Sequence, residues 1–273
     1  MKKIAICVGH GLSNSGNIYD PGAIGNGFEE YNIVKEIAKY AWQYLKTNYD
    51  CTVDLINYNK DKNLNQRINY CNAHKYDFVA EVHMNASTVL SATGTEAYYN
   101  DTVGKKVADL VCKNLASTLS LSQRPNWIDD GGDKSTTYFG IVCRTTMPAI
   151  LIETCFISNP SDVSKVSTEA KQKNAGIAIA KAIASGLGIS AKNNTSVNTN
   201  LRYYVQVGSF AKIQNASNLK KLLVKAGYDA KLVKSGSNYL AAVGPYTNKK
   251  EAETFKLKLN TSGYPNAYIR AFK

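Results

Sequence analysis

Two patterns of apolar residues alternate along residues 1–187. Short runs of Ile, Val and Leu are followed by longer segments in which apolar residues recur with a helical period, as Ile33, Ile37 and Ala41 do. This alternation predicts an α/β fold, a twisted and mostly parallel sheet flanked by helices. The expected strands are Ile4–Val8, Thr52–Asn57, Phe78–His83, Gly94–Tyr99, Tyr138–Arg144 and Ala149–Glu153. The expected helices are Glu30–Lys46, Leu64–His74, Val103–Thr118 and Glu169–Leu187.

A polar segment separates this first part from a shorter second part. Residues 188–200 are rich in Asn, Ser and Thr, which is typical of a linker. Within residues 201–273, the run Val205–Phe210 recurs in outline as Ala241–Tyr246. Each run precedes a helix-period segment and a further strand, so the order β-α-β-β-α-β predicts a small α+β domain of the ferredoxin-like type. The expected helices are 213–226 and 248–260, and the expected closing strands are Ala230–Val233 and Ala267–Ala271.

The positive charge of the chain is concentrated in the second part. Of a formal net charge of +12, residues 201–273 carry +10, with 13 Lys and Arg against 3 Asp and Glu. Such a field favours an anionic polymer as a partner; nucleic acid, acidic lipid and bacterial wall polymers all qualify on charge alone. Apolar residues make up 44% of the chain, enough for packed cores and against global disorder.

Candidate chemistry lies where the expected strands end. His10 follows the first strand, His83 ends the third and Glu153 ends the last, and the carboxyl ends of parallel strands share one edge of a sheet. Glu29 or Glu30, at the start of the first helix, adds a second carboxylate. Two histidines and one carboxylate suit a catalytic zinc with an open position, and the remaining carboxylate can act as general acid and base.

Each of these residues also has an ordinary structural interpretation. A single histidine at a strand end is most often a satisfied polar residue, and carboxylates in the first turn of a helix commonly complement its dipole. His74, with no second ligand at helical spacing, is interpreted as a surface residue. Cys155, just beyond the last strand, could instead pair with His83 in a thiol hydrolase, which is the weaker alternative.

The ordered motifs of residues 2–187 resemble the type-3 family of zinc N-acetylmuramoyl-L-alanine amidases. The resemblance implies that His10, Glu30 and His83 bind one zinc ion, that Glu153 is catalytic, and that Glu30 rather than Glu29 is the ligand. Asn85, Arg67 and Arg144 become candidate substrate contacts, with a structural salt bridge as the alternative role for either arginine. The motifs are Val8-Gly9-His10-Gly11, Asp20-Pro21-Gly22-Ala23, Asn65-Gln66-Arg67-Ile68, His83-Met84-Asn85-Ala86, Met147–Glu153 and Phe156–Pro160.

One position departs from the family pattern. Members often carry Ser two residues before the second histidine, whereas this chain has Glu81. Alternation along a strand places Glu81 on the same side as His83. It is expected either to face solvent or to contact the imidazole of His83 as the partner of a metal ligand.

Residues 202–272 resemble the SPOR module, a domain that binds peptidoglycan. The resemblance rests on Tyr204–Phe210, Gly227-Tyr228 and Val243–Tyr246. It implies wall contacts by Gln206, Phe210 and Tyr246, with Tyr203 and Tyr239 as weaker candidates. The alternative is that Phe210 and Tyr246 only cap the small core.

Taken together, the motifs predict a peptidoglycan hydrolase that cuts between N-acetylmuramic acid and L-alanine, as a phage endolysin or a bacterial autolysin. No transmembrane segment and no signal peptide are expected, since the apolar start of the chain stops at Gly9. Synthesis in the cytoplasm would then require a holin-like lesion or cell lysis before the enzyme reaches the wall. The alternatives are a catalytically inactive wall-binding protein or a nucleic-acid-binding protein. Nucleic acid is not expected as a partner, because the base-stacking motif of RNA-binding sheets is missing.

Overall fold

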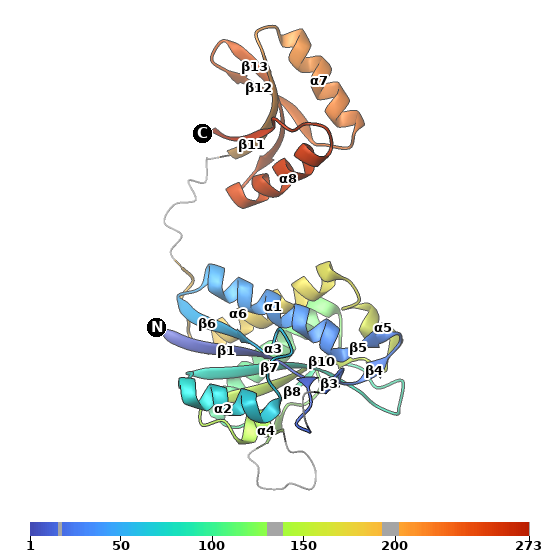
Figure 1. The fold of residues 1–273 in the computed structure, drawn as a ribbon, viewed down its shortest axis with the longest axis vertical. Helices are drawn as coiled ribbons and strands as arrows, with labels where there is room; N and C mark the ends of the chain where they lie inside the picture. Colours follow the sequence, from blue (N-terminus) through green and yellow to red (C-terminus); the bar gives the residue numbers. More distant parts are fainter. Residues whose placement is uncertain (16–17, 130–138, 193–201, 273) are drawn as a thin grey trace. The chain divides into compact units, whose positions relative to one another are not determined.

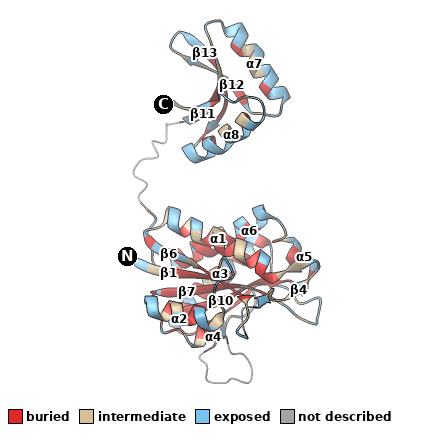
Figure 2. Ribbon diagram, in the orientation of Figure 1, coloured by how far each residue is buried: buried red, intermediate tan, exposed pale blue. Residues whose placement is uncertain are grey.

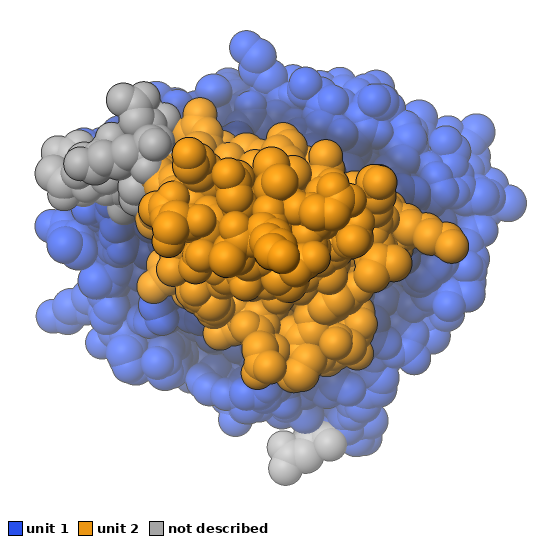
Figure 3. Space-filling view, turned by 90° about the horizontal axis from the view of Figure 1, so that it is seen from above, with its two compact units in different colours: residues 1–192 blue, residues 193–273 orange. Residues whose placement is uncertain are grey.

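The computed structural model describes residues 1–15, 18–129, 139–192 and 202–272. The chain divides into two compact units, residues 1–192 and 193–273, which Figure 3 draws in separate colours. The first unit therefore ends later than the predicted linker begins. The Asp50 amide donates a hydrogen bond to the Ser190 carbonyl, and the Lys192 amide donates one to the Asn48 carbonyl. These bonds hold Ser190 and Lys192 on the first unit. The rest of the expected linker lies outside the described residues.

The first unit is built on a six-stranded sheet in the order β6-β1-β7-β10-β8-β9. The four strands β6, β1, β7 and β10 are mutually parallel, and β8 pairs antiparallel with β10. The prediction of a mostly parallel sheet is therefore confirmed. The strands are β1 (Lys2–Val8), β6 (Cys51–Ile56), β7 (Phe78–Asn85), β8 (Glu96–Tyr99), β9 (Trp127–Ile128) and β10 (Ala149–Phe156), and short hairpins are formed by β2 (Gly11–Leu12) with β3 (Tyr19–Asp20) and β4 (Ile24–Gly25) with β5 (Phe28–Glu29).

Helices cover both faces of this sheet, which explains why its central strands are apolar throughout (Figures 1 and 2). Ile4, Ile6 and Val8 pack with α1, α3 and α6, whereas Ala5 and Cys7 pack with α2 and α4 on the opposite face. Burying both sets of side chains fixes the register of β1, because a slip of one residue would exchange the two faces. The helices are α1 (Glu30–Asn48), α2 (Leu64–His74), α3 (Thr102–Leu119), α4 (Gly140–Cys143), α5 (Pro160–Ser164) and α6 (Glu169–Gly186).

The strand expected at Tyr138–Arg144 is wrong. Tyr138 lies outside the described residues, and Gly140–Cys143 forms the short helix α4. The Asp129 carboxylate accepts a hydrogen bond from the Phe139 amide, and Ile141 and Val142 are buried with α2. A short apolar run has the same composition in a buried strand and in a buried helical turn, so the pattern could not separate them.

The second unit has the predicted β-α-β-β-α-β order. Its antiparallel sheet runs β12-β13-β11-β14, and α7 and α8 pack on one face (Figure 1). Val205, Ala241 and Val243 form the core beneath the helices, together with Leu223 and Leu259. The elements are β11 (Arg202–Phe210), α7 (Ile213–Lys225), β12 (Ala230–Ser235), β13 (Asn238–Tyr246), α8 (Lys249–Thr261) and β14 (Tyr268–Phe272).

Within the described residues, every helix is too short or too polar to cross a membrane.

Candidate metal centre

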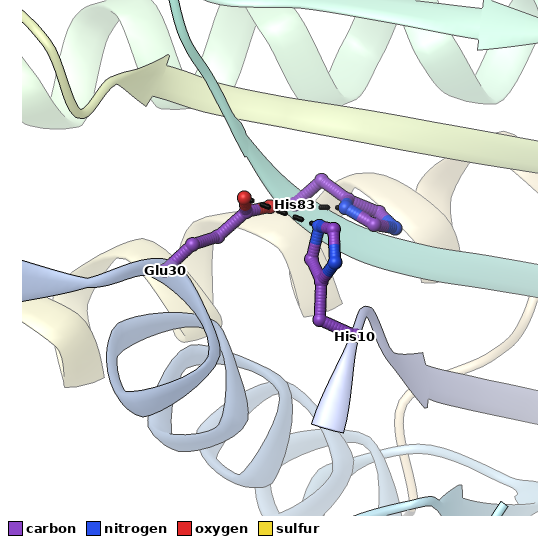
Figure 4. A group of neighbouring side chains, drawn as sticks. All are labelled: His10, Glu30 and His83. Atoms are coloured by element: carbon purple, nitrogen blue, oxygen red, sulfur yellow. Dashed lines mark hydrogen bonds and ion pairs between the residues drawn. The ribbon is translucent and has the colours of Figure 1, made fainter. Parts of the chain in front are cut away.

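Three side chains meet at the carboxyl edge of the first unit's sheet. His10 follows β1, His83 lies in β7 and Glu30 is the first residue of α1. The Glu30 carboxylate faces both imidazole rings (Figure 4), with 3.1 Å between its Oε2 and His10 Nε2 and 3.0 Å between its Oε1 and His83 Nδ1. One donor atom from each of the three residues lies within 4.8 Å of the others. Zinc ligands in a tetrahedron stand about 3.3 Å apart, so this donor set fits one ion with little movement.

The loop that carries His10 is strained and firmly held. His10 has a φ of +60°, in the left-handed region that only about a few per cent of non-glycine residues adopt. The Asn57 side chain donates to the carbonyls of Val8 and His10, at 3.0 and 2.7 Å. The other ring nitrogen of His10, Nδ1, lies 3.0 Å from Asp20 Oδ2. These contacts direct Nε2 of His10 toward Glu30.

Two glycines leave room for the donor atoms. A Cβ on Gly9 would stand 2.4 Å from the His83 ring. A Cβ on Gly22 would stand 2.7 Å from Glu30 Oε2, and Gly22 also has a positive φ of +71°. Side chains at these positions would therefore fill the space where the three donors converge.

The charges of the donors are strongly coupled. Burial alone would raise the pKa of Glu30, but hydrogen bonds from His10 and His83 hold it well below its usual range. Burial alone would lower the pKa of His83, but its bonds to Glu30 and Glu81 raise it to about 10. In the metal-free protein, this cluster is therefore a carboxylate bound to an imidazolium.

A second carboxylate, that of Glu153, stands beside the cluster. Glu153 in β10 is in parallel register with His83 in β7. Only 8% of Glu153 is exposed, and its Oε2 has no hydrogen-bond partner among the described residues. Burial is the main cause that raises the pKa of Glu153 to about 7. A carboxyl with that pKa can both take up and release a proton near neutral pH.

A cavity of about 510 Å³ opens over these residues. His10, Glu30 and His83 line one part of it, and Glu153 lines another. An apolar wall borders the cavity, made by Leu12, Leu64, Phe139, Ile141 and Leu151. The site thus combines metal donors, a proton-accepting group and space for a substrate, which is the arrangement of a metal-assisted hydrolase.

Comparison with known proteins shows to which family this chain belongs. The family described as N-acetylmuramoyl-L-alanine amidase (Amidase_3) matches residues 4–185, more than half of the chain. The chain belongs to this amidase family. The SPOR domain family matches residues 200–271. Both resemblances seen in the motifs are therefore confirmed.

Relatives of the amidase come from bacteria and from a phage. The sporulation-specific N-acetylmuramoyl-L-alanine amidase of Bacillus subtilis is 31% identical over 234 residues, which cover 84% of each chain. The endolysin of Bacillus phage SPP1 is 28% identical over 200 residues, 71% of this chain and 69% of the endolysin. The catalytic domain of the amidase CwlV from Bacillus (Paenibacillus) polymyxa var. colistinus superposes with a TM-score of 0.60 at 27% identity, covering 70% of this chain and all of that domain.

The three predicted substrate contacts have other partners in the amidase. Arg67 is buried against Glu81, so the structural salt bridge considered for it is present. The Asn85 side chain donates to Glu96 Oε1 at 2.6 Å. Arg144 donates to the Asn65 side chain at 2.8 Å. Direct contacts of these residues with substrate stay predictions.

Two further interpretations are decided by burial. Glu81 is only 1% exposed, so the expectation that it faces solvent is wrong. Cys155 is fully buried, burial raises the pKa of its thiol far above the usual range, and its Sγ points to the Asp162 carbonyl. Because a buried neutral thiol is inert, the thiol-hydrolase alternative loses its nucleophile. His74 stacks on Tyr70 and bonds to its carbonyl, away from the donor cluster.

Two residues that position the site were missed in the sequence. Asp20 lies in the motif Asp20–Ala23, and its carboxylate contacts the ring of His10. Asn57 is buried and braces the His10 loop. Asn57 directly follows β6 at the carboxyl edge of the sheet, so the strand-end argument that found His10 could also have found Asn57.

The predicted wall-binding residues divide between the two faces of the second sheet. Tyr246 is buried and stacks on Phe255 of α8, with 4.8 Å between ring centroids, so it caps the core. Phe210 lies beside Leu219 of α7, since a Cβ on Gly208 would meet both side chains. Gln206 alternates with the core residue Val205 and so lies on the face that the helices leave uncovered. Its Oε1 is buried without a hydrogen-bond partner among the described residues.

Proposed function

We propose that the chain is a zinc-dependent N-acetylmuramoyl-L-alanine amidase, which hydrolyses the amide between the lactyl group of N-acetylmuramic acid and L-alanine of the peptidoglycan stem peptide. Family membership supports the reaction class. The observation that carries the proposal is the convergence of His10, Glu30 and His83 beside Glu153, whose Oε2 is buried without a hydrogen-bond partner among the described residues. A wall-binding protein without catalysis would have no need of a buried carboxylate held beside three metal donors.

Zinc is the ion that this donor set suits, because two imidazoles and one carboxylate leave a fourth position open. When bound, zinc would polarise the scissile carbonyl and lower the pKa of a water. The chain's own residues supply the rest. Glu153 Oε2 takes the proton of the attacking water and passes it to the nitrogen of the departing alanine, a transfer suited to a pKa near neutrality.

The second unit is proposed to hold the enzyme on its insoluble substrate. The SPOR match and the charge of residues 201–273 support binding to an anionic wall. Gln206 is the proposed contact because it lies on the face that the helices leave uncovered. Only 5% of it is exposed, so its side chain must turn outward before the carbonyl oxygen can accept a hydrogen bond from the glycan. Tyr246 is better explained as a core residue, given its stack on Phe255, whereas Phe210 is half-buried beside Leu219 of α7.

Binding of nucleic acid through the same charges is the second candidate function. The two are separated by comparing retention of the protein on purified wall sacculi and on heparin across a salt series. Wall binding that survives salt concentrations which elute the heparin column supports the wall partner. Equal salt sensitivity of both would favour binding by charge alone.

Activity is tested by release of dye from labelled walls, with and without a chelator. The proposal expects release by the purified protein, loss of release in the presence of chelator, and recovery when zinc is added back. Release that continues unchanged after verified removal of metal would refute a zinc mechanism. The relatives include both a sporulation amidase and a phage endolysin, and either setting agrees with this activity.

A further inference from the structure

We propose that Glu81, held by Arg67, is a positioning residue that sets which nitrogen of His83 binds the metal. The inference rests on the proposed zinc site and goes beyond it, because neither residue is a metal donor there. It assigns a function to the position at which this chain departs from the family pattern.

Glu81 contacts the side of the His83 ring that faces away from Glu30. Both residues lie on the same side of β7, and Glu81 Oε1 is 3.0 Å from His83 Nε2. His83 Nδ1 is 3.0 Å from Glu30 Oε1. The ring is therefore held between two carboxylates, one at each nitrogen.

The chemistry of the carboxylate decides the assignment. An ionised carboxylate only accepts hydrogen bonds, so Glu81 requires a proton on Nε2 of His83. Glu81 is buried with both carboxylate oxygens against the guanidinium of Arg67, and this ion pair keeps Glu81 ionised. With the proton fixed on Nε2, Nδ1 is the nitrogen that remains for the metal. A carboxylate in this position also strengthens the ring as a donor.

Arg67 holds Glu81 in the required orientation. Its Nε lies 2.7 Å from Glu81 Oε2 and its Nη2 lies 3.3 Å from Oε1, so the guanidinium grips both oxygens. The same guanidinium donates through Nη1 to the carbonyl of His10 at 3.3 Å and to that of Lys62 at 3.1 Å. Arg67 thus connects the backbone of His10, one proposed ligand, to Glu81, which contacts the other proposed ligand, His83.

Replacing Glu81 by glutamine, E81Q, tests this role with little change in volume. The amide of glutamine can donate to Nε2 and so stabilise the wrong tautomer, with the proton on Nδ1. The expected result is a fall in zinc affinity of about 10- to 100-fold, measured on the folded protein by competition with a chromophoric chelator. The matched control is D162N. Asp162 is also a buried carboxylate, but it binds Thr93 and the amides of Gly94 and Phe156.

A purely structural role of Glu81 would affect both variants alike. If the inference holds, E81Q loses zinc affinity, whereas D162N, although destabilised, binds zinc within about threefold of the wild type. E81Q affinity within threefold of the wild type would overturn the inference while leaving the proposed function intact. A wild-type chain that takes up no zinc would overturn the proposed function and the inference with it.

A second measurement needs no variant and serves if E81Q fails to fold. The ¹⁵N resonances of His83 in the zinc-loaded wild-type protein report which ring nitrogen carries the proton. The inference expects a protonated Nε2 and a metal-bound Nδ1. A protonated Nδ1 with the metal on Nε2 would contradict it.

Discussion

Glu153 lies directly beside His83 across two parallel strands, β10 and β7. This register places a carboxylate next to a proposed metal ligand without making it a ligand itself, and in the part of the chain that the structure describes its Oε2 has no hydrogen-bond partner. Substitution of Glu153 should therefore separate catalysis from metal binding. We expect E153Q to retain zinc and to lose about a hundred- to ten-thousand-fold in rate, the usual contribution of a general acid and base. Zinc content by mass spectrometry and dye release from walls measure the two effects. Wall clearing by E153Q at the wild-type rate would remove Glu153 from the mechanism.

The raised pKa of Glu153 also predicts how stability depends on pH. Because the folded pKa is about 7 and the unfolded value is 4.5, the folded state binds more protons between these values. The stability of the metal-free protein should therefore fall as pH rises from 4.5 to 7, by roughly 3 kcal/mol at about 1.4 kcal/mol per pKa unit. E153Q should lack this component. Urea unfolding of both proteins at pH 5 and pH 8, followed by tryptophan fluorescence, gives the difference, since both tryptophans lie in the first unit. Parallel pH profiles of the two proteins would contradict the raised pKa.

Uptake of zinc should release a proton from His83. Its pKa of about 10 means that the free ring is doubly protonated at pH 7.5, and a metal can bind only a deprotonated nitrogen. Calorimetric titration with zinc in two buffers of different ionisation enthalpy should show at least one proton released per ion bound. H83A should bind zinc much more weakly. A binding enthalpy that is independent of the buffer would show that the imidazole is already neutral.

A single methyl group at Gly9 should damage the metal centre. The added Cβ of G9A would stand 2.4 Å from the His83 ring, so the ring must move. We expect zinc affinity to fall at least tenfold, on the scale of losses that follow the displacement of a supporting contact. G140A is the control. Gly140 lines the same cavity, but its Cβ would meet side-chain atoms of Leu64, Ile68 and Arg144 at 3.3, 3.4 and 3.8 Å, much farther away than the His83 ring is from a Cβ on Gly9. Equal zinc affinities of G9A and G140A would contradict the described packing.

Wall binding by the second unit should depend on Gln206 rather than on Tyr246. Q206A removes the amide of this 5%-exposed side chain, and sedimentation with purified sacculi should fall by about two- to tenfold, the equivalent of one hydrogen bond. Y246F keeps the stack on Phe255 and should bind like the wild type. Cleavage of small soluble wall fragments should be unchanged in both. Normal sedimentation of Q206A would assign the wall contact to another part of the surface.

The candidate site could be located from the sequence because parallel strands place their carboxyl ends on one edge of the sheet. His10, His83 and Glu153 were found in this way, and the structure brings them together. The choice of Glu30 over Glu29 needed the family resemblance, since both residues begin the same helix. In the structure, Glu30 faces the two imidazoles and Glu29 accepts from Tyr19 and Asn32.

Other features depend on three-dimensional packing that local patterns do not record. The run after Tyr138 is apolar in either a strand or a helical turn, and contact with α2 selects the helix. The burial of Glu81 follows from Arg67, which reaches it from α2, fourteen residues earlier in the chain. In the second unit, strand alternation alone would not assign Phe210 to the helix face, because the pairing shifts between Gln206 and Gly208.

The central claim is that a metal held by His10, Glu30 and His83, with Glu153 beside it, cuts the bond between the glycan and its stem peptide. Mass spectrometry of purified sacculi digested by the zinc-loaded protein tests this most directly. The account predicts new L-alanine N-termini, intact glycan strands and no such products from E153Q. New reducing ends in the glycan, or cleavage within the stem peptide, would contradict it.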